Sequence, residues 1–423
     1  MIRYTASCPR CKYKTTFTPT KIISGEIYEC LHCKLKLKIE KMGVAPKGKK
    51  EVEQAIITNP LVTNGVEIES YLIRNYEIID GGFVQPVTEV IEPGEIFTDD
   101  ETIGNEYNSP IFDEINEGLF LIKSGLRKYR KFCEKKGDYQ IGLFGTWLEH
   151  SAGTHLHIAL DREEGISKNE AIPLMMYLHD YLPFIIALCA NSVVLPEGIE
   201  NKPTLNSNAS NRMVKYGATH CKSIEKKELK LGKSDHWAEI DYNYFRKEKP
   251  PTIEIRVADS NIPEFVIAAV TIIRILTNAY LKGKHSPNNL FFSNYKTSKN
   301  NAAINGVQAS LYWNNKNIKF EDYIDKFFDT FREELEVEGP NDEILDIFRL
   351  AKIGWNNAVI MRESIEYIKR IYSPKKYNWR RQFLLRYINA ISSLLDGKTI
   401  EKYAELLEVK FPDTSNVKLG KKF

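Results

Sequence analysis

Hydrophobic and charged positions alternate over three short stretches of this chain with the two-residue period of a β-strand. In Thr-Ile-Glu-Ile-Arg-Val-Ala-Asp at 252–259, Glu254 and Arg256 fall on one face and the aliphatic residues beside them on the other. Gly-Val-Glu-Ile-Glu at 65–69 presents two carboxylates in the same way, and Gly-Thr-His-Leu-His-Ile at 153–158 presents two imidazoles. Three such strands predict one sheet with an apolar face and a chemically active face.

The remaining pattern predicts a mixed fold whose last third is mainly helical. A helix begins near Ser260 or Asn261, either of which can cap it, with Pro263 in the first turn, and it runs to about Leu281. Further helices are predicted at 114–135, 168–190, 319–335, 341–371, 379–396 and 399–408. Further strands are predicted at 15–18, 26–29, 35–39, 70–73, 140–145 and 241–245. Segments 84–110 and 195–216 contain Pro, Gly and other turn residues, and we expect them to be loops.

Four cysteines near the N-terminus have the spacing of a zinc site. Cys8 and Cys11 form one CxxC pair, and Cys30 and Cys33 form a second. Two such knuckles complete a tetrahedral four-thiolate site, which leaves no open position and therefore indicates a structural Zn²⁺ rather than catalysis. The short strands around the pairs resemble a zinc ribbon. A module this small needs the metal to supply folding energy.

Three domains or segments follow from these signals. Residues 1–45 form the zinc ribbon, and residues 46–62, with Lys47, Lys49 and Lys50 beside Pro and Gly, are predicted to be a linker. The main domain, 63–423, contains the three alternating strands and is helical from about residue 261.

Composition excludes several classes of protein and leaves others open. The chain has 423 residues, of which 43% are hydrophobic and 27% charged, and its net charge of +3 gives no argument for nucleic acid or a membrane surface. Its apolar stretches, such as 184–190 and 266–276, are too short or too interrupted to span a bilayer, and Met-Ile-Arg-Tyr at the N-terminus is no signal peptide. We therefore expect a cytoplasmic protein without a membrane partner. Cys133, Cys189 and Cys221 lack a partner motif and are expected to be buried.

The ligand-type side chains of the three strands suit a hard divalent cation. Glu67, Glu69, Glu254 and His155 form a set that Mg²⁺ prefers and that Mn²⁺ tolerates well. Such ions usually hold nucleotide phosphates, and a nearby arginine such as Arg256 would neutralise a transferring phosphoryl group.

His157 is a second candidate cation for the phosphate. The sequence contains neither GxxxxGK[ST] nor GxGxxG after a strand. The pattern therefore favours phosphoryl or acyl-phosphate chemistry without a P-loop.

Each motif alone has a simpler interpretation. Glu-x-Glu on a strand is usually solvated, His-x-His is often incidental, and Glu-x-Arg is usually a surface ion pair. A zinc hydrolase is a rival constellation, in which Glu67, His155 and His157 would be the three ligands.

The ordered set of motifs resembles glutamate–cysteine ligase family 2, the carboxylate–amine ligases of the wider glutamine-synthetase-like fold. The resemblance covers residues 63 to about 400, and it includes Leu-Cys-Ala-Asn-Ser at 188–192 followed by Ser-Asn-Arg at 210–212. It implies an α+β fold, with a curved antiparallel sheet packed by helices. It also implies ATP and two or more Mg²⁺ ions on the concave face.

The resemblance further implies roles for individual residues. Glu67, Glu69, His155 and Glu254 would be magnesium ligands. His157 would contact nucleotide phosphate, Arg256 would stabilise the γ-phosphoryl group, and Arg212 would hold substrate carboxylate or phosphate. The family phosphorylates a carboxylate, and an amine then attacks the acyl phosphate to make an amide.

The N-terminal ribbon departs from the family, whose usual members lack it. It either braces the catalytic domain or docks a protein, peptide or RNA substrate. The expected partner of the enzyme is an amino-acid, peptide or carrier-protein substrate; nucleic acid is possible but not favoured. A homo-oligomer is possible. The alternatives to a ligase are a zinc-ribbon adaptor with an inactive ligase-like domain and a metal-dependent hydrolase.

Overall fold

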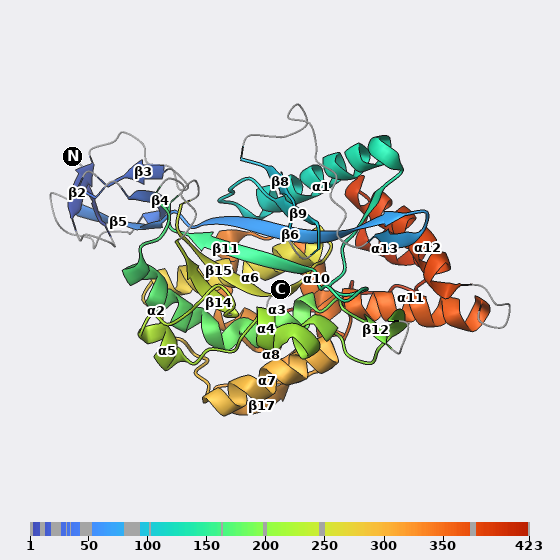
Figure 1. Cartoon of the computed structure of the whole chain (residues 1–423). Coiled ribbons are helices and arrows are strands. Elements are labelled where there is room, and N and C mark those ends of the chain that lie inside the picture. The colour runs from blue at the N-terminus through green and yellow to red at the C-terminus, as the bar shows by residue number, and fades with distance from the viewer. Residues whose placement is uncertain are drawn as a thin grey trace.

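A computed structural model describes the chain over residues 3–8, 13–17, 27–30, 32–33, 35–42, 53–79, 94–100, 103–161, 164–197, 201–244, 250–372 and 378–421. Cys11 and the lysines of the predicted linker lie outside these residues. The described part combines helices with largely antiparallel sheets (Figure 1).

An antiparallel sheet organises the main body, and it contains all three alternating stretches. Its strand order is β14-β15-β11-β6-β9-β8, and β10 and β7 pair with the far end of β6. The strands are β6 (Thr63–Arg74), β7 (Glu77–Ile79), β8 (Ile96–Thr98), β9 (Asn105–Asn108), β10 (Gln140–Gly142), β11 (Gly153–Ala159), β14 (Ile240–Asn243) and β15 (Thr252–Asp259). The prediction that the three stretches are neighbouring strands of one sheet is therefore confirmed.

One face of this sheet forms the core, as the alternation requires. Val66, Ile68, Leu156 and Ile255 are all at most 2% exposed. Helices α2 and α3 pack against β15, and α6 packs across α1, α2 and α3. The helices are α1 (Ile115–Gly137), α2 (Lys168–Leu178), α3 (Leu182–Cys189), α4 (Gly217–His220), α5 (Lys226–Lys230), α6 (Pro263–Leu281), α7 (Phe292–Asn305), α8 (Phe320–Thr330), α9 (Arg332–Glu338), α10 (Asp342–Lys352), α11 (Asn357–Tyr372), α12 (Trp379–Leu395) and α13 (Ile400–Leu406).

The predicted helices are present, with different boundaries. The helix predicted at 168–190 is α2 and α3 joined by a 3₁₀ turn at His179–Tyr181. Pro263 is the first residue of α6 as predicted, but Ile262 rather than Ser260 or Asn261 occupies the cap position. The Asn261 side chain instead accepts a hydrogen bond from Ile262 N–H at 2.9 Å and donates one to Cys189 O at 3.0 Å. Asn261 therefore ties the start of α6 to the end of α3.

Two segments that were predicted to be loops contain regular structure. Segment 84–110 contains β8 and β9, and segment 195–216 contains most of the hairpin β12 (Val194–Glu197) and β13 (Lys202–Leu205) and a π-helical turn at Arg212–Tyr216. These predictions were wrong because Pro and Asn occupy strands that cover only three or four residues each, too few for a clear alternation. Helix α7 and the hairpin β16 (Ser310–Trp313) and β17 (Lys316–Lys319) were not predicted.

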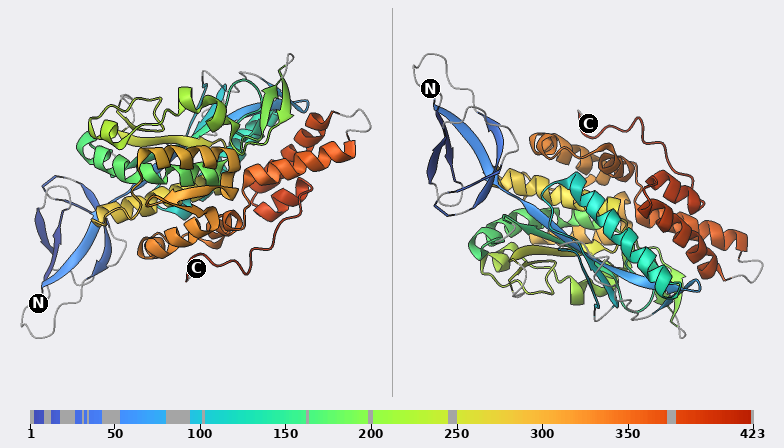
Figure 2. Two further views of the ribbon diagram at one scale, coloured as in Figure 1. Left: turned by 90° about the horizontal axis from the view of Figure 1, so that it is seen from below. Right: turned by 90° about the horizontal axis from the view of Figure 1, so that it is seen from above.

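The N-terminal module has its own five-stranded sheet, with strand order β2-β1-β5-β4-β3. Its strands are β1 (Arg3–Ser7), β2 (Lys14–Phe17), β3 (Ile27–Glu29), β4 (Lys36–Met42) and β5 (Glu53–Pro60). Strand β5 lies within the predicted linker, and only Leu61 and Val62 separate it from β6. The chain therefore passes from one sheet into the other almost without interruption, and the module projects from one end of the body (Figure 2).

Two helical stretches are long and apolar enough to cross a membrane by composition, Lys168–Cys189 and Pro263–Leu281. Their most apolar windows are 83% and 89% buried inside the fold, as expected for core helices.

Candidate active site

The polar face of the sheet brings the predicted carboxylates and imidazoles into contact. Strand pairing sets His155 opposite Glu67, and His157 opposite Glu254. His155 Nδ1 lies 3.3 Å from Glu67 Oε2 and 3.3 Å from Glu254 Oε1, and its Nε2 lies 3.5 Å from Glu69 Oε1. We call Glu67, Glu69, Glu254, His155 and His157 the central cluster.

Arg256 borders the central cluster on β15. Its Nη2 lies 2.8 Å from Glu254 Oε1, and its Nη1 lies 3.5 Å from His155 Nε2. The side chains of Glu254 and Arg256 are only 1% and 17% exposed. The pair is therefore no solvated surface ion pair, and its charges interact in a partly desolvated site where Coulomb energies are larger.

Charge in the central cluster shifts the pKa values of its members. Burial alone would raise the pKa of Glu67, but His157 and His155 hold it well below its ordinary value. Burial and Arg256 oppose the charged form of His155, yet the pKa of this imidazole is raised because three carboxylates surround it. Burial raises the pKa of Glu69 to about 7. The site therefore holds opposite charges close together among buried side chains.

The donor set fits a divalent cation. Ligand atoms of Glu67, His157 and Glu254 all lie within 4.8 Å of one another, and so do those of Glu67, Glu106 and His155. His157 Nε2 lies 3.5 Å from Glu67 Oε2, and among the described residues it has no hydrogen-bond partner. Neighbouring ligands of an ion held at about 2.1 Å are roughly 3 Å apart, so one cation fits between these two atoms.

Two acidic residues of the site were missed from the sequence. Glu106 on β9 faces the central cluster because β9 pairs with β6, and Asp100 follows β8. Ligand atoms of Glu69, Asp100 and Glu106 also lie within 4.8 Å of one another. Burial and the charge of Glu67 raise the pKa of Glu106. Both residues lie in the segment that was predicted to be a loop, where no alternation marked a strand.

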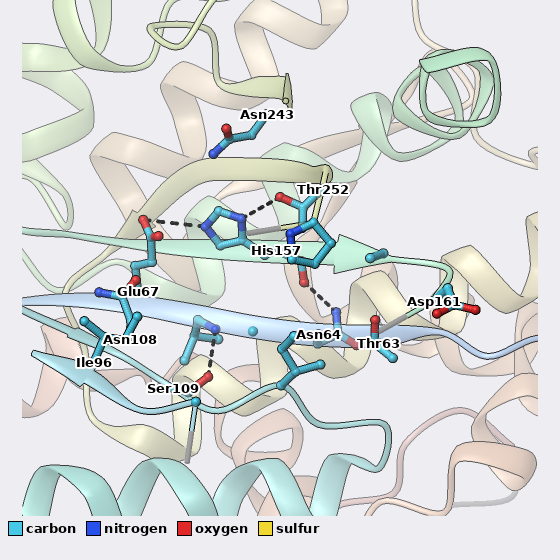
Figure 3. A pocket seen from close by; sticks show the side chains of 16 residues that line it. Thr63, Asn64, Glu67, Ile96, Asn108, Ser109, His157, Asp161, Asn243 and Thr252 are labelled. Atoms are coloured by element: carbon cyan, nitrogen blue, oxygen red, sulfur yellow. Dashed lines mark hydrogen bonds and ion pairs between the residues drawn. The ribbon is translucent and has the colours of Figure 1, made fainter. Parts of the chain in front are cut away.

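A narrow cavity of about 250 Å³ opens at one end of the central cluster (Figure 3). We call it the strand-end cavity, because the start of β6 and of β15 and the end of β11 and of β14 line it. Its lining is largely neutral and apolar. Glu67 and His157 lie together at the end away from Asp161, which we call the inner end. The other lining residues are Thr63, Asn64, Gly65, Val66, Gly94, Ile96, Asn108, Ser109, Ile111, Ala159, Asp161, Asn243, Pro250 and Thr252.

Two hydrogen bonds orient the walls of this cavity. His157 Nδ1 is 2.9 Å from Thr252 Oγ1, which fixes the imidazole ring and directs Nε2 toward Glu67. Asn243 Nδ2 donates to Glu254 Oε2 at 3.0 Å. The inner end of the cavity is therefore preorganised for a charged group.

A second, wider cavity of about 880 Å³ lies on the other side of the cluster, and it also includes Glu67. We call it the arginine cavity, because Arg212 and Arg256 line it. Its other lining residues are Glu69, Asp100, Glu106, Glu149, His150, Ser151, His155, Lys215, Tyr216, His220, His236 and Trp237. His236 and Trp237 thus form part of the wall of a pocket.

Arg212 is buried and contacts the protein backbone. Its Nη1 donates to Ala258 O at 3.2 Å and its Nη2 to Arg256 O at 3.0 Å. The missing side chain of Gly153 leaves room for the guanidinium, since a Cβ there would lie 2.4 Å from Arg212 Nη2. Arg212 therefore fixes the backbone of β15 at Arg256 as well as lining the cavity.

A β-bulge explains how β15 presents two different sets of polar groups. The register between β11 and β15 shifts between Thr154 and Leu156, which leaves an extra residue on β15 opposite His155. Asp259 consequently pairs with Gly153, and its carboxylate accepts hydrogen bonds from Asn191 N–H and Ser210 Oγ, both at 2.8 Å. Simple alternation would have placed Asp259 on the opposite face.

A buried ion pair between Lys299 and Glu239 is joined to β15 through the Glu239 backbone. Lys299 Nζ lies 2.6 Å from Glu239 Oε2 and donates to Cys221 O at 2.9 Å and to Ser223 Oγ at 2.7 Å. Glu239 O in turn accepts from Arg256 N–H at 3.1 Å. These contacts hold the segment that carries part of the arginine-cavity wall against the strand that carries Arg256.

Three cysteines of the N-terminal module converge. The sulfur atoms of Cys8, Cys30 and Cys33 all lie within 4.8 Å of one another, and the Cys8 and Cys33 sulfurs are 3.6 Å apart. Two thiolates on a tetrahedral zinc ion, each about 2.3 Å from the metal, are roughly 3.8 Å apart. The geometry therefore fits the predicted zinc site, for which Cys11 would be the fourth ligand.

No protein-family model matches the chain, and no curated protein matches its sequence. One similar solved structure is the complex between the prokaryotic ubiquitin-like protein Pup and its ligase PafA, with a TM-score of 0.47, 12% identity, and coverage of 83% of this chain and 79% of that chain. Glutamate–cysteine ligase from Francisella tularensis in complex with AMP gives a TM-score of 0.46 and 13% identity, with coverage of 82% of this chain and 92% of that chain. A bifunctional glutathione synthetase from Pasteurella multocida gives a TM-score of 0.47 and 11% identity, with coverage of 86% of this chain and 58% of that chain. Likenesses this distant assign no activity to the chain.

Proposed function

We propose that this protein is an ATP-dependent carboxylate–amine ligase of glutamine-synthetase-like type. One observation carries the proposal: the central cluster, which suits a divalent cation, lies between two cavities of different character that both include Glu67. The narrow, largely neutral strand-end cavity suits a nucleoside. The wide arginine cavity, which Arg212, Lys215 and Arg256 line beside the carboxylates of the central cluster, suits a carboxylate substrate and its amine partner.

The chemistry follows from this division. A substrate carboxylate oxygen attacks the γ-phosphorus of ATP, the bond to the β-phosphate oxygen breaks, and ADP leaves. The amine nitrogen then attacks the acyl-phosphate carbon, phosphate leaves, and the nitrogen loses a proton. Both steps develop negative charge on phosphate oxygens, where preorganised cationic donors are most effective.

Residues of this chain have distinct roles in that scheme. Glu67, Glu69, His155 and Glu254 would hold the magnesium or manganese ions, and Glu106 joins them as an additional candidate ligand. The bound ions would supply charge neutralisation and orientation for the phosphates. Arg256, held by Glu254, would face the transferring phosphoryl group.

His157 has two compatible roles at the inner end of the strand-end cavity. The sequence prediction made it a phosphate contact, and its distance to Glu67 also makes it a candidate ion ligand. Arg212 would position Arg256 through its carbonyl and present any remaining donor to the substrate. Zn²⁺ at Cys8, Cys11, Cys30 and Cys33 would be structural.

The alternatives fit the site less well. A zinc hydrolase using Glu67, His155 and His157 leaves the strand-end cavity and the further carboxylates without a role. In an inactive adaptor the buried, charged cluster would cost free energy of folding and would serve no binding or catalytic function.

Nucleotide binding tests the proposal directly. Titration calorimetry with a non-hydrolysable ATP analogue should show binding that requires Mg²⁺. Glu254→Gln and Arg256→Ala should abolish ADP release from ATP in the presence of carboxylate and amine substrates, whereas Glu405→Gln, which removes an exposed carboxylate that lines neither cavity, should not. The absence of magnesium-dependent nucleotide binding would refute the ligase, and turnover without ATP would favour the hydrolase.

A further inference from the structure

The thiolate cluster lies beside a turn of the N-terminal module. Cys30 N–H donates to Leu35 O at 2.8 Å, which holds Leu35 beside the first cysteine of the second pair. Leu35 and Leu37 are fully buried in a small core together with Cys8 and Cys30. A metal held by these thiolates supplies much of the stability of such a small module, so the position of residue 35 depends on the metal.

The next residue, Lys36, contacts the main body through its backbone N–H. Its N–H donates to Asp161 Oδ2 at 3.2 Å, and its carbonyl accepts from Leu61 N–H at 3.0 Å. The first contact joins the module to the segment that follows β11, and the second continues the pairing of β4 with β5 inside the module. Movement of the turn would therefore reach the main body at Asp161.

Asp161 links this contact to the strand-end cavity. It is 2% exposed, it lines the cavity, and it follows His157 and Ala159 along the same edge (Figure 3). The loss of one hydrogen-bond donor leaves a buried carboxylate less well compensated for its burial, which favours its movement or the entry of water. Either change would alter the wall of the cavity.

We infer that metal binding at the N-terminal thiolates and nucleotide binding in the strand-end cavity are coupled through Asp161. The inference rests on the proposed function, which assigns the nucleotide to that cavity. The N-terminal module then acts as a brace, and its metal strengthens nucleotide binding without touching the nucleotide. Thermodynamic linkage requires the reverse effect with the same factor: bound nucleotide must strengthen retention of the metal.

A four-state cycle tests the coupling. The affinity of a non-hydrolysable ATP analogue is measured with Mg²⁺ for zinc-loaded protein and for protein stripped with a zinc-selective chelator, in the wild type and in Asp161→Ala. One hydrogen bond to a buried charge corresponds to a change of roughly tenfold. We expect zinc removal to weaken binding about tenfold in the wild type and less than twofold in Asp161→Ala, because that variant has already lost the link.

Zinc release gives a second readout that does not depend on catalysis. The nucleotide analogue should raise the chelator concentration needed to extract zinc from the wild type, but not from Asp161→Ala. Lys38→Ala is the matched control, since it breaks another contact between module and body, the Lys38–Glu114 pair at 3.5 Å, which does not reach the cavity. This variant should behave like the wild type in both measurements.

The outcomes separate this inference from the proposed function. If the wild type binds nucleotide and zinc removal has no effect, or has the same effect in Asp161→Ala, the coupling is refuted and the ligase proposal stands. If zinc-loaded wild type binds no nucleotide with Mg²⁺, both are refuted.

Discussion

Two glycines on the polar face of the sheet should respond oppositely to the same added methyl group. Gly153 begins β11 and Gly65 lies on β6. A Cβ on Gly153 would lie 2.4 Å from Arg212 Nη2 and 2.8 Å from its Cζ, whereas a Cβ on Gly65 would meet nothing within 4 Å. Neither residue has a backbone conformation that only glycine adopts. The difference between the two substitutions is therefore one of space.

The expected magnitude follows from these distances. Non-bonded carbon and nitrogen atoms approach to about 3.5 Å, so in Gly153→Ala the guanidinium must move by roughly 1 Å. It then loses good geometry to Ala258 O and Arg256 O. Overpacking costs about 1–3 kcal/mol and weakened charged hydrogen bonds add to it, while reduced freedom of the unfolded chain returns about 0.4–1 kcal/mol. We expect Gly153→Ala to lower the free energy of unfolding by about 2 kcal/mol and to abolish ligase turnover.

Gly65→Ala should leave stability unchanged or raise it by up to about 1 kcal/mol. Its methyl group would enter the strand-end cavity, so nucleotide affinity should fall while the fold is retained. Urea denaturation and calorimetric titration with the ATP analogue measure the two effects separately. In an Arg212→Ala background, Gly153→Ala should cost close to nothing, because the two residues are in contact and their effects are not additive.

The reasoning would be refuted if Gly153→Ala unfolded at the same urea concentration as the wild type and retained turnover. It would also be refuted if the cost of Gly153→Ala persisted in full without Arg212, since the steric conflict would then lie elsewhere.

Two further predictions concern charges around β15 and β9. Lys299→Met should lower the free energy of unfolding by about 3–5 kcal/mol, because it leaves Glu239 buried without its cation, and adding Glu239→Gln should recover much of that loss in urea denaturation. An equal loss in the double variant would contradict this account. Glu106→Gln should raise the Mg²⁺ concentration needed for half-maximal ATP turnover with an unchanged melting temperature; an unchanged magnesium requirement would remove Glu106 from the ion site.

The polar face was predictable where a strand is long enough to show its period. Residues 65–69, 153–158 and 252–259 each cover at least two full alternations, and the structure places their charged side chains together as expected. Glu106 was not predictable, because β9 has only four residues. The strand's other face carries the polar Asn105, so polar and apolar residues do not alternate along it. Short strands owe their conformation to their neighbours rather than to their own sequence.

The bulge and the arginine show a second limit. Alternation cannot reveal an extra residue on β15, so Asp259 was assigned no contact with Gly153. The resemblance to the ligase family suggested a substrate contact for Arg212, but not the two backbone carbonyls that its guanidinium binds. Both features depend on how strands meet, which a single sequence does not encode locally.

The short passage from β5 to β6 has a consequence for how such chains can change length. Only Leu61 and Val62 separate the two strands, and β6 is held on both sides by β9 and β11. Because an extended chain reverses its faces at every residue, one inserted residue at this point would turn the whole N-terminal module by about half a rotation around the strand axis. Lys36 would then face away from Asp161. Natural variants of this architecture should therefore keep the passage at fixed length or change it by two residues at a time.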